Sequence, residues 1–218
     1  MPKRGPKPFL PVGVRNRIEG FIDAEEGDRL AFHAASVPSG MAVVELGSAS
    51  GSGALFLAAG IRQGGAAGVR LHCFDPYEDG PDDHRAAKQY RDPLALDLLN
   101  ARARYVGVDK LIDVHKMRSL EGAERWARKS FGDQPIGLLH VDALHDYDNA
   151  TADVKAWAHM VAPGGVLIMH DLYGRRAGEV ERAVNEYVMP SGEWQEIGRY
   201  QWSRSTRRRG QFIARRKG

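Results

Sequence analysis

Short apolar runs alternate with amphipathic segments along this chain, from about residue 24 to its end. The apolar runs predict buried β-strands, expected at 41–46, 69–74, 111–115, 136–141 and 166–169. The amphipathic segments before, between and after them predict helices, expected at 24–37, 51–61, 84–106, 120–131, 151–161 and 179–188. We expect Pro163-Gly164-Gly165 to stop the helix over 151–161. Two further strands, near 194–200 and 211–214, are expected to close the chain.

Strands that alternate with helices predict βαβ units and a parallel sheet. The closing pair of strands, around an arginine-rich turn, predicts an antiparallel strand at one edge. The expected fold class is α/β: a Rossmann-like, seven-stranded, mostly parallel sheet with an antiparallel C-terminal strand and helices on both faces. Residues 1–24 begin with proline, glycine and basic residues and predict an N-terminal arm that can act as a lid, whereas 25–218 are expected to form one domain.

Composition indicates the cellular compartment and excludes some kinds of site. Cys73 is the only cysteine among 218 residues, which excludes an internal disulfide and a cysteine metal cage. The chain has no long apolar run and no signal-peptide pattern at its start, so we expect a cytoplasmic protein. The net charge is +3, with basic residues gathered at both ends. Such ends bind phosphate backbones or form solvated tails, and we favour the tails because no stacking aromatics are interleaved with the charges.

A glycine-rich turn follows the first predicted strand. Glu45 stands near the end of that strand, and Gly47, Gly51 and Gly53 follow. Glycine permits close approach of a ligand to the backbone, and the helix that starts there can hold a negative group. A carboxylate at Glu45 repels a dinucleotide's pyrophosphate but suits the ammonium and sulfonium of S-adenosylmethionine (SAM). We therefore expect SAM, rather than NAD, to bind Glu45, Gly47, Ser48 and Gly51.

Two other strand ends are expected to complete the cofactor site. Asp75 ends the second strand, where a carboxylate can accept hydrogen bonds from both ribose hydroxyls. Ser119 follows the third strand and is expected near the adenine by analogy with the fold. Asp142, after the fourth strand, is expected to face the cofactor as well.

Carboxylates and histidines follow the fourth and fifth strands. Asp142 is followed three residues later by His145, and the next strand ends at His170-Asp171. Because the carboxyl ends of parallel strands meet at one edge, Asp142 and Asp171 can share Mg²⁺, which prefers oxygen ligands. The metal would lower the pKa of a bound hydroxyl, and His145 is a suitable general base. His170 is either a third metal ligand or a strand residue that holds Asp171.

These motifs resemble one family. Residues 44–47, 141–147 and 161–171 look like the class I SAM-dependent methyltransferases that include the metal-dependent sugar O-methyltransferases of macrolide pathways, with catechol O-methyltransferase more distant. The resemblance implies that Asp142 and an acid pair at 170–171 hold Mg²⁺ and that His145 is the base. His170 departs from that acid pair, and Ala49 departs from a glycine common in the turn. Short length and composition also resemble the mycobacterial methyltransferases of methylmannose polysaccharides.

The resulting hypothesis is a SAM-dependent O-methyltransferase that acts on a sugar or another polyhydroxylated small molecule, assisted by Mg²⁺. We also considered an RNA methyltransferase, a NAD-dependent oxidoreductase, and a binding protein that retains the fold without activity. A homodimer is the expected assembly, by analogy with small enzymes of this kind. The methyl acceptor has no recognisable sequence code.

Overall fold

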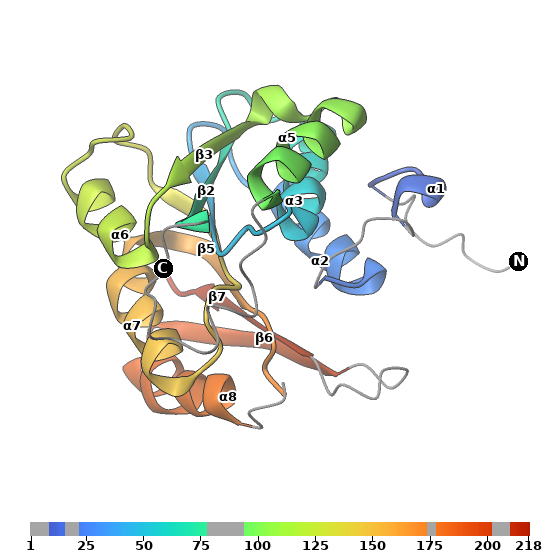
Figure 1. Ribbon diagram of the computed structural model, residues 1–218. Helices are drawn as coiled ribbons and strands as arrows, with labels where there is room; N and C mark the ends of the chain where they lie inside the picture. Colours follow the sequence, from blue (N-terminus) through green and yellow to red (C-terminus); the bar gives the residue numbers. More distant parts are fainter. Residues whose placement is uncertain (1–8, 16–21, 78–93, 174–177, 202–209) are drawn as a thin grey trace, which may run out of the picture.

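The structure is a computed structural model that describes residues 9–15, 22–77, 94–173, 178–201 and 210–218. Its centre is a seven-stranded sheet in the order β3-β2-β1-β4-β5-β7-β6 (Figure 1). β7 runs antiparallel to both of its neighbours, and every other pairing is parallel, which confirms the predicted fold class. The strands are β1 (Ala42–Leu46), β2 (Arg70–Asp75), β3 (Ile112–Lys116), β4 (Ile136–Val141), β5 (Val161–Met169), β6 (Trp194–Gln201) and β7 (Gly210–Arg216).

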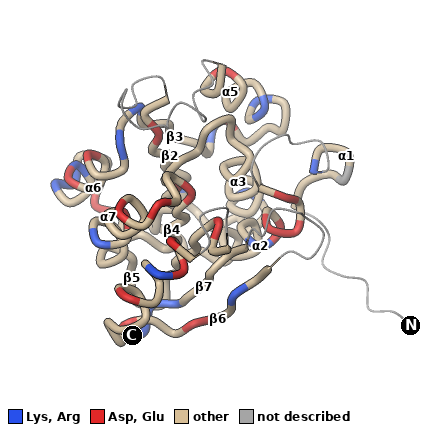
Figure 2. Tube along the Cα trace, turned by 60° about the horizontal axis from the view of Figure 1, so that its bottom comes forward, with Lys and Arg blue, Asp and Glu red and all other residues tan. Residues whose placement is uncertain are grey.

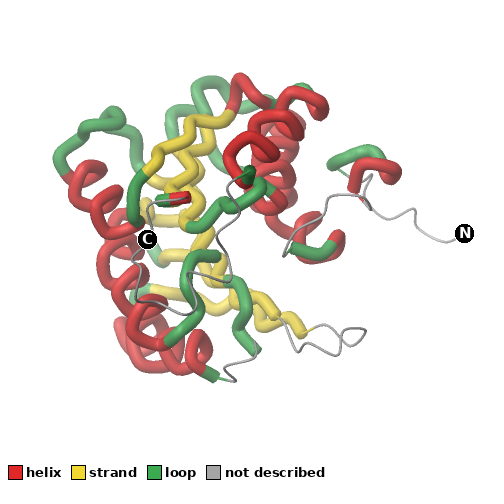
Figure 3. The backbone as a smooth tube through the Cα atoms, in the orientation of Figure 1, coloured by secondary structure: helices red, strands yellow, loops and turns green. Residues whose placement is uncertain are grey.

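Helices cover both faces of the sheet (Figure 3). One face packs against α2 (Ala24–Ala35), α3 (Ser52–Gly64) and α5 (Ala95–Val106). The other face packs against α6 (Ser119–Ala127), α7 (Tyr147–Trp157) and α8 (Glu179–Ala183), which continues as a π-helix over Val184–Val188. The short α1 (Val12–Arg15) and 3₁₀ turns at Asp109–Leu111, Ala158–Met160 and Met189–Ser191 complete the described elements. The first part of the helix predicted over 84–106 lies outside the described residues.

Several predicted boundaries were wrong. The helix expected over 151–161 is observed at Tyr147–Trp157, and Pro163, Gly164 and Gly165 lie within β5 instead of stopping that helix. β5 begins at Val161, five residues before the expected start, because Val161 pairs with Ile136 and carries Pro163 and Gly164 into the strand. The helix expected over 120–131 ends at Ala127, and Lys129 beyond it adopts a left-handed φ of 59°. At the start of β5, strand pairing outweighs the local sequence pattern, and at the end of α6 a tight turn does so.

α2 lies unusually close to α3. A Cβ on Gly60 would stand 2.2 Å from the carbonyl oxygen of Ala31, and one on Gly64 would stand 2.3 Å from that of Ala35. Asp23 begins α2 by accepting hydrogen bonds from two backbone N–H groups of the first turn. Ahead of α2, Leu10 is fully buried in the same core, although it falls in the predicted arm.

The sheet places three strand ends at one level. Leu46 pairs with Val141, and Val141 pairs with Met169. The ladder continues beyond the strands, since Asp142 N–H donates to Leu46 O at 2.8 Å and His170 N–H donates to Val141 O at 3.0 Å. β1 lies between β2 and β4, where the strand order reverses, and such switch points bind ligands in open α/β sheets. Among the described helices, none is long and apolar enough to cross a membrane.

Candidate active site

The loop after β1 packs directly against the segment after β4. Gly47 has φ 84°, and a Cβ there would stand 2.3 Å from the carbonyl oxygen of Asp142. Gly51, with φ 88°, begins α3 without any side-chain cap. Ala49, in the same loop, has a positive φ of 42°. The loop therefore needs the left-handed conformations that glycine adopts most easily, and it is locked to the Asp142 segment.

Asp75 ties this loop to β2. Its carboxylate accepts hydrogen bonds from Ala49 N–H at 2.9 Å and from Tyr77 N–H at 2.7 Å. Burial raises the pKa of the Asp75 carboxyl, and these backbone donors oppose that rise. Asp75 thus holds the loop in shape. Its predicted contact with ribose hydroxyls stays a prediction.

Glu45 lies beneath the loop rather than at its surface. Its side chain is 1% exposed, and Oε1 lies 3.1 Å from Nδ1 of the buried His140. Cys73 Sγ donates to the other carboxylate oxygen at 3.6 Å. Burial raises the pKa of Glu45, against the effect of His140. The Glu45 carboxyl, which favoured SAM in the sequence, therefore contacts His140 in the interior, and direct binding of a cofactor by Glu45 stays a prediction.

Ser119 joins two helices. Its hydroxyl, at the start of α6, donates to the Asp153 carboxylate on α7, and its carbonyl accepts from Trp157 Nε1 at 3.0 Å. Burial raises the pKa of Asp153 to about 6, although the Ser119 hydroxyl opposes the rise. The expected place of Ser119 beside an adenine stays a prediction.

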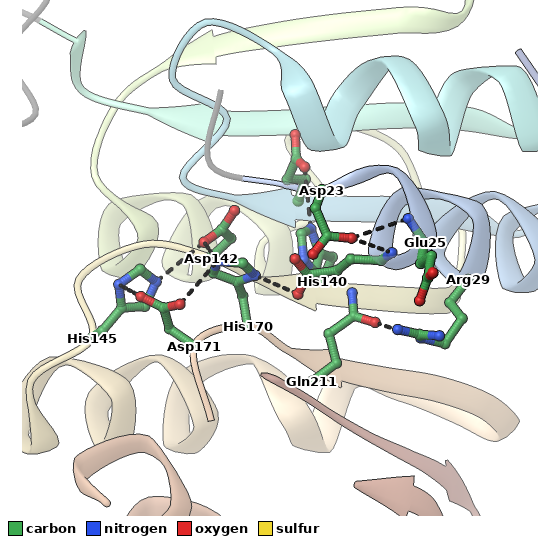
Figure 4. Close-up of polar contacts among 11 residues, drawn as sticks. Asp23, Glu25, Arg29, His140, Asp142, His145, His170, Asp171 and Gln211 are labelled. Carbon is green, nitrogen blue, oxygen red and sulfur yellow. Dashed lines mark hydrogen bonds and ion pairs between the residues drawn. The ribbon is translucent and has the colours of Figure 1, made fainter. Parts of the chain in front are cut away.

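The ends of β4 and β5 bring four predicted residues together (Figure 4). His145 Nε2 lies 3.1 Å from Asp142 Oδ1, and His145 Nδ1 lies 3.4 Å from Asp171 Oδ2. His170 Nε2 lies 3.2 Å from Asp171 Oδ1 and 3.7 Å from Asp142 Oδ1. Two imidazoles thus contact both carboxylates. Asp171 has φ 53°, a conformation that turns the chain directly after the strand.

Sequence reasoning missed a fifth member of the cluster. Glu26, on α2, places Oε1 2.8 Å from His170 Nδ1, and both side chains are 1% exposed. The sequence held one signal, because Glu26 stands on the apolar stripe of α2 with Leu30 and Ala34, at a spacing of four residues. A carboxylate on a buried stripe requires a partner, and that partner is 144 residues away in the chain.

The pKa values of His170 and Asp142 shift in opposite directions. Burial alone would lower the pKa of His170, but Asp142 and Glu26 outweigh it and hold that pKa well above its ordinary value. Burial alone would raise the pKa of Asp142, but His170 and His145 bring it below its ordinary value. Each of these two pKa shifts favours the charged form of its group.

The expected Mg²⁺ does not fit this arrangement. Nδ1 of His170 faces Glu26 and Nε2 faces Asp142 and Asp171, so the ring stands where a shared Mg²⁺ would have to reach both carboxylates. Across the described residues, no group of three or more His, Cys, Asp and Glu side chains is arranged to hold a metal ion. The second interpretation of His170, a strand-end residue that holds Asp171, agrees with the geometry.

The basic segments that raised the RNA alternative lie mostly outside the described residues. Two C-terminal basic residues that are described contact the protein itself: Arg216 donates to His159 O at 2.7 Å, and Lys217 donates to Gly192 O at 2.8 Å. Elsewhere on the described chain, Lys and Arg are interspersed with Asp and Glu (Figure 2). Neither feature indicates a continuous basic surface in that part of the protein.

Solved structures with the same architecture include three enzymes. The O-methyltransferase TomG from Streptomyces achromogenes, involved in tomaymycin synthesis and solved with SAM, has 17% identity and a TM-score of 0.66, over 91% of this chain and 82% of that one. An O-methyltransferase from Bacillus cereus, solved with S-adenosylhomocysteine, has 14% identity and a TM-score of 0.67, over 94% and 86%. An rRNA methylase from Streptococcus thermophilus has 15% identity and a TM-score of 0.59, over 88% and 96%.

At such low identity these likenesses show a shared fold only, and they carry no information about the substrate. Comparison of the sequence with family profiles is more specific about the family. A family profile described as a methyltransferase domain matches residues 44–172, which is more than half of the chain and runs from within β1 to just beyond the end of β5. This chain therefore belongs to the methyltransferase-domain family.

Proposed function

We propose that the protein transfers a methyl group from SAM to a hydroxyl group of a small molecule, with His145 as the general base. The observation that carries this proposal is the Asp142–His145 pair, 3.1 Å apart at the carboxyl edge of the sheet and beside the loop after β1. A carboxylate that accepts from one imidazole nitrogen orients the ring and leaves the other nitrogen to take a proton.

The loop after β1 suits the donor. No side chain within the described residues caps α3 at Gly51, so the first amides of that helix are suited to a carboxylate such as that of SAM's amino-acid group. Asp75 stands across the loop from it and is suited to the ribose. When bound, SAM would supply a methyl group on its sulfonium, with S-adenosylhomocysteine as the leaving group when the acceptor oxygen bonds to that methyl carbon.

The chain's own residues position the acceptor and remove its proton. We assign the Nε2 proton of His145 to the contact with Asp142, so that Nδ1 faces Asp171 and the acceptor. Asp171 accepts a hydrogen bond from the acceptor and directs the reacting hydroxyl to Nδ1. The proton passes to His145 as the carbon–oxygen bond forms and the carbon–sulfur bond breaks. Holding both reactants in line supplies much of the rate.

A polyhydroxylated acceptor, such as a sugar, suits this site best. The side chains of Asp142, Asp171 and His145 are 10%, 17% and 21% exposed, so each retains some surface for a ligand. Two carboxylates beside an imidazole provide acceptors for neighbouring hydroxyls. The proposal includes no Mg²⁺, because His170 lies between the carboxylates.

An activity screen against sugars and glycosides, with S-adenosylhomocysteine formation as the readout, tests the proposal. His145→Ala is expected to lower kcat by about 10²–10⁴-fold while calorimetric binding of S-adenosylhomocysteine is unchanged. His159→Ala is the matched control, because His159 is exposed in the 3₁₀ turn that follows α7. Full kcat in His145→Ala would remove this residue as the base.

Two binding experiments separate the alternatives. Calorimetry that shows binding of NADH but not of S-adenosylhomocysteine would overturn the proposal in favour of an oxidoreductase. Methylation of RNA with a steep dependence of binding on salt would replace the small-molecule acceptor. We further propose that the protein acts in the cytoplasm as a homodimer, and light scattering of the purified protein tests the dimer.

A further inference from the structure

We propose that His170, held by Glu26 of α2, occupies the place between Asp142 and Asp171 that the expected Mg²⁺ would take, so that this site works without a metal. The inference deepens the proposed function and rests on it for the identity of the reaction. Its geometric basis is independent of the acceptor.

The first support is the position of the imidazole. Nε2 of His170 lies 3.2 Å from Asp171 Oδ1 and 3.7 Å from Asp142 Oδ1. Mg²⁺ binds carboxylate oxygens at about 2.0–2.1 Å and retains several waters, so it needs open space between the oxygens. The ring of His170, which is 1% exposed, fills that space from below. A cation could enter only if His170 moved.

The second support is what prevents that movement. Nδ1 of His170 lies 2.8 Å from Glu26 Oε1, and Glu26 is 1% exposed. Breaking this contact would leave a buried carboxylate without its partner, which is costly in a protein interior. α2 in turn is fixed against α3 by the close contacts at Gly60 and Gly64. Glu26 therefore anchors His170 through a packed helix.

The third support is the arrangement of the carboxylates. Glu26, Asp142 and Asp171 surround His170, and its two ring nitrogens face all three of them. His145 contacts Asp142 and Asp171 as well. Glu26 precedes the residues matched by the family profile, so this feature comes from a part of the chain that the family pattern leaves out.

Glu26 and His170 are thus positioning residues. They hold Asp142 and Asp171 in the places from which these carboxylates orient His145 and the acceptor. At metal sites the loss of outer partners costs about 10–100-fold in metal affinity or activity, and we expect an effect of similar order here.

Binding of Mn²⁺, followed by electron paramagnetic resonance of the full-length protein without acceptor, tests the inference. The wild type is expected to leave Mn²⁺ free in solution, and its methyl transfer is expected to be unchanged by EDTA. His170→Asp restores an acid pair beside Asp142 and is expected to bind about one Mn²⁺ per chain. His159→Asp, which makes the same change at an exposed position, is the control and is expected to bind none. A wild-type protein that binds one Mn²⁺, and loses it in Asp171→Asn, would overturn the inference.

A second pair of variants keeps the test decisive if His170→Asp does not fold. Glu26→Gln is expected to lower kcat about 10-fold or more with the KM for SAM unchanged, whereas Glu25→Gln, one residue away and exposed, is expected to change neither. Glu26→Asp is expected to recover part of the lost kcat. Equal kinetics in Glu26→Gln and Glu25→Gln would contradict the positioning role. If no acceptor is found, the Mn²⁺ measurement alone still decides between a metal site and a histidine-filled one.

Discussion

Replacing Gly47 with alanine tests whether the loop after β1 and the Asp142 segment are locked together. The new Cβ would stand 2.3 Å from the carbonyl oxygen of Asp142 and 2.6 Å from Ala143 Cα, so one backbone segment must move. The φ of 84° adds strain of about 1–2 kcal/mol for a residue with a side chain. Overpacking adds about 1–3 kcal/mol. We therefore expect the free energy of unfolding to fall by about 2–5 kcal/mol.

Gly65→Ala separates the two contributions. Gly65 also has a positive φ, 66°, but a Cβ there would meet nothing within 4 Å. Its loss is expected to be the strain alone, about 1–2 kcal/mol, and urea denaturation measures both variants. Gly47→Ala is also expected to lower kcat by as much as about 10²-fold, because it displaces Asp142. Equal losses of stability in the two variants would refute the contact between the loops.

Three further predictions concern stability. Asp153, with a pKa of about 6 against 3.8 when unfolded, binds its proton more tightly in the folded state, so the stability it contributes is present below pH 3.8 and is lost as pH rises through about 6. Urea denaturation at both ends of this range should show that the free energy of unfolding falls by up to about 3 kcal/mol as pH rises. This fall should disappear in Asp153→Asn and persist in Asp148→Asn, which changes an exposed position. Leu10→Ala is expected to cost about 2–5 kcal/mol, and a loss below about 1 kcal/mol would show that this segment is a detachable arm. Gly60→Ala is expected to lower Tm by separating α2 from α3, and an unchanged Tm would contradict their close packing.

Much of the fold was predictable because local patterns of apolar and polar residues determine it. The apolar runs located the seven strands to within a few residues, except for the start of β5. That start depends on Ile136, which pairs with Val161 across the sheet. Pro163 and Gly164 locally indicate a stop, and only the partner strand shows that the chain is extended there.

The candidate site was likewise predictable in part. Asp142, His145, His170 and Asp171 follow adjacent strands, so the sequence brought them to one edge of the sheet, where the structure has them in contact. The sequence could not choose between a metal ligand and a supporting residue at His170. That choice depends on which way the ring faces, and on what it meets there.

The sequence by itself determined the alternation of strands and helices, the parallel sheet and the edge at which the polar residues gather, because these follow from the spacing of side chains along the chain. Only the tertiary structure decided the chemistry within that edge. It paired Glu45 with His140, and Glu26 with His170, across 95 and 144 residues. Contacts of this kind leave no local pattern, since a buried charge reveals its need for a partner but not where in the fold that partner lies.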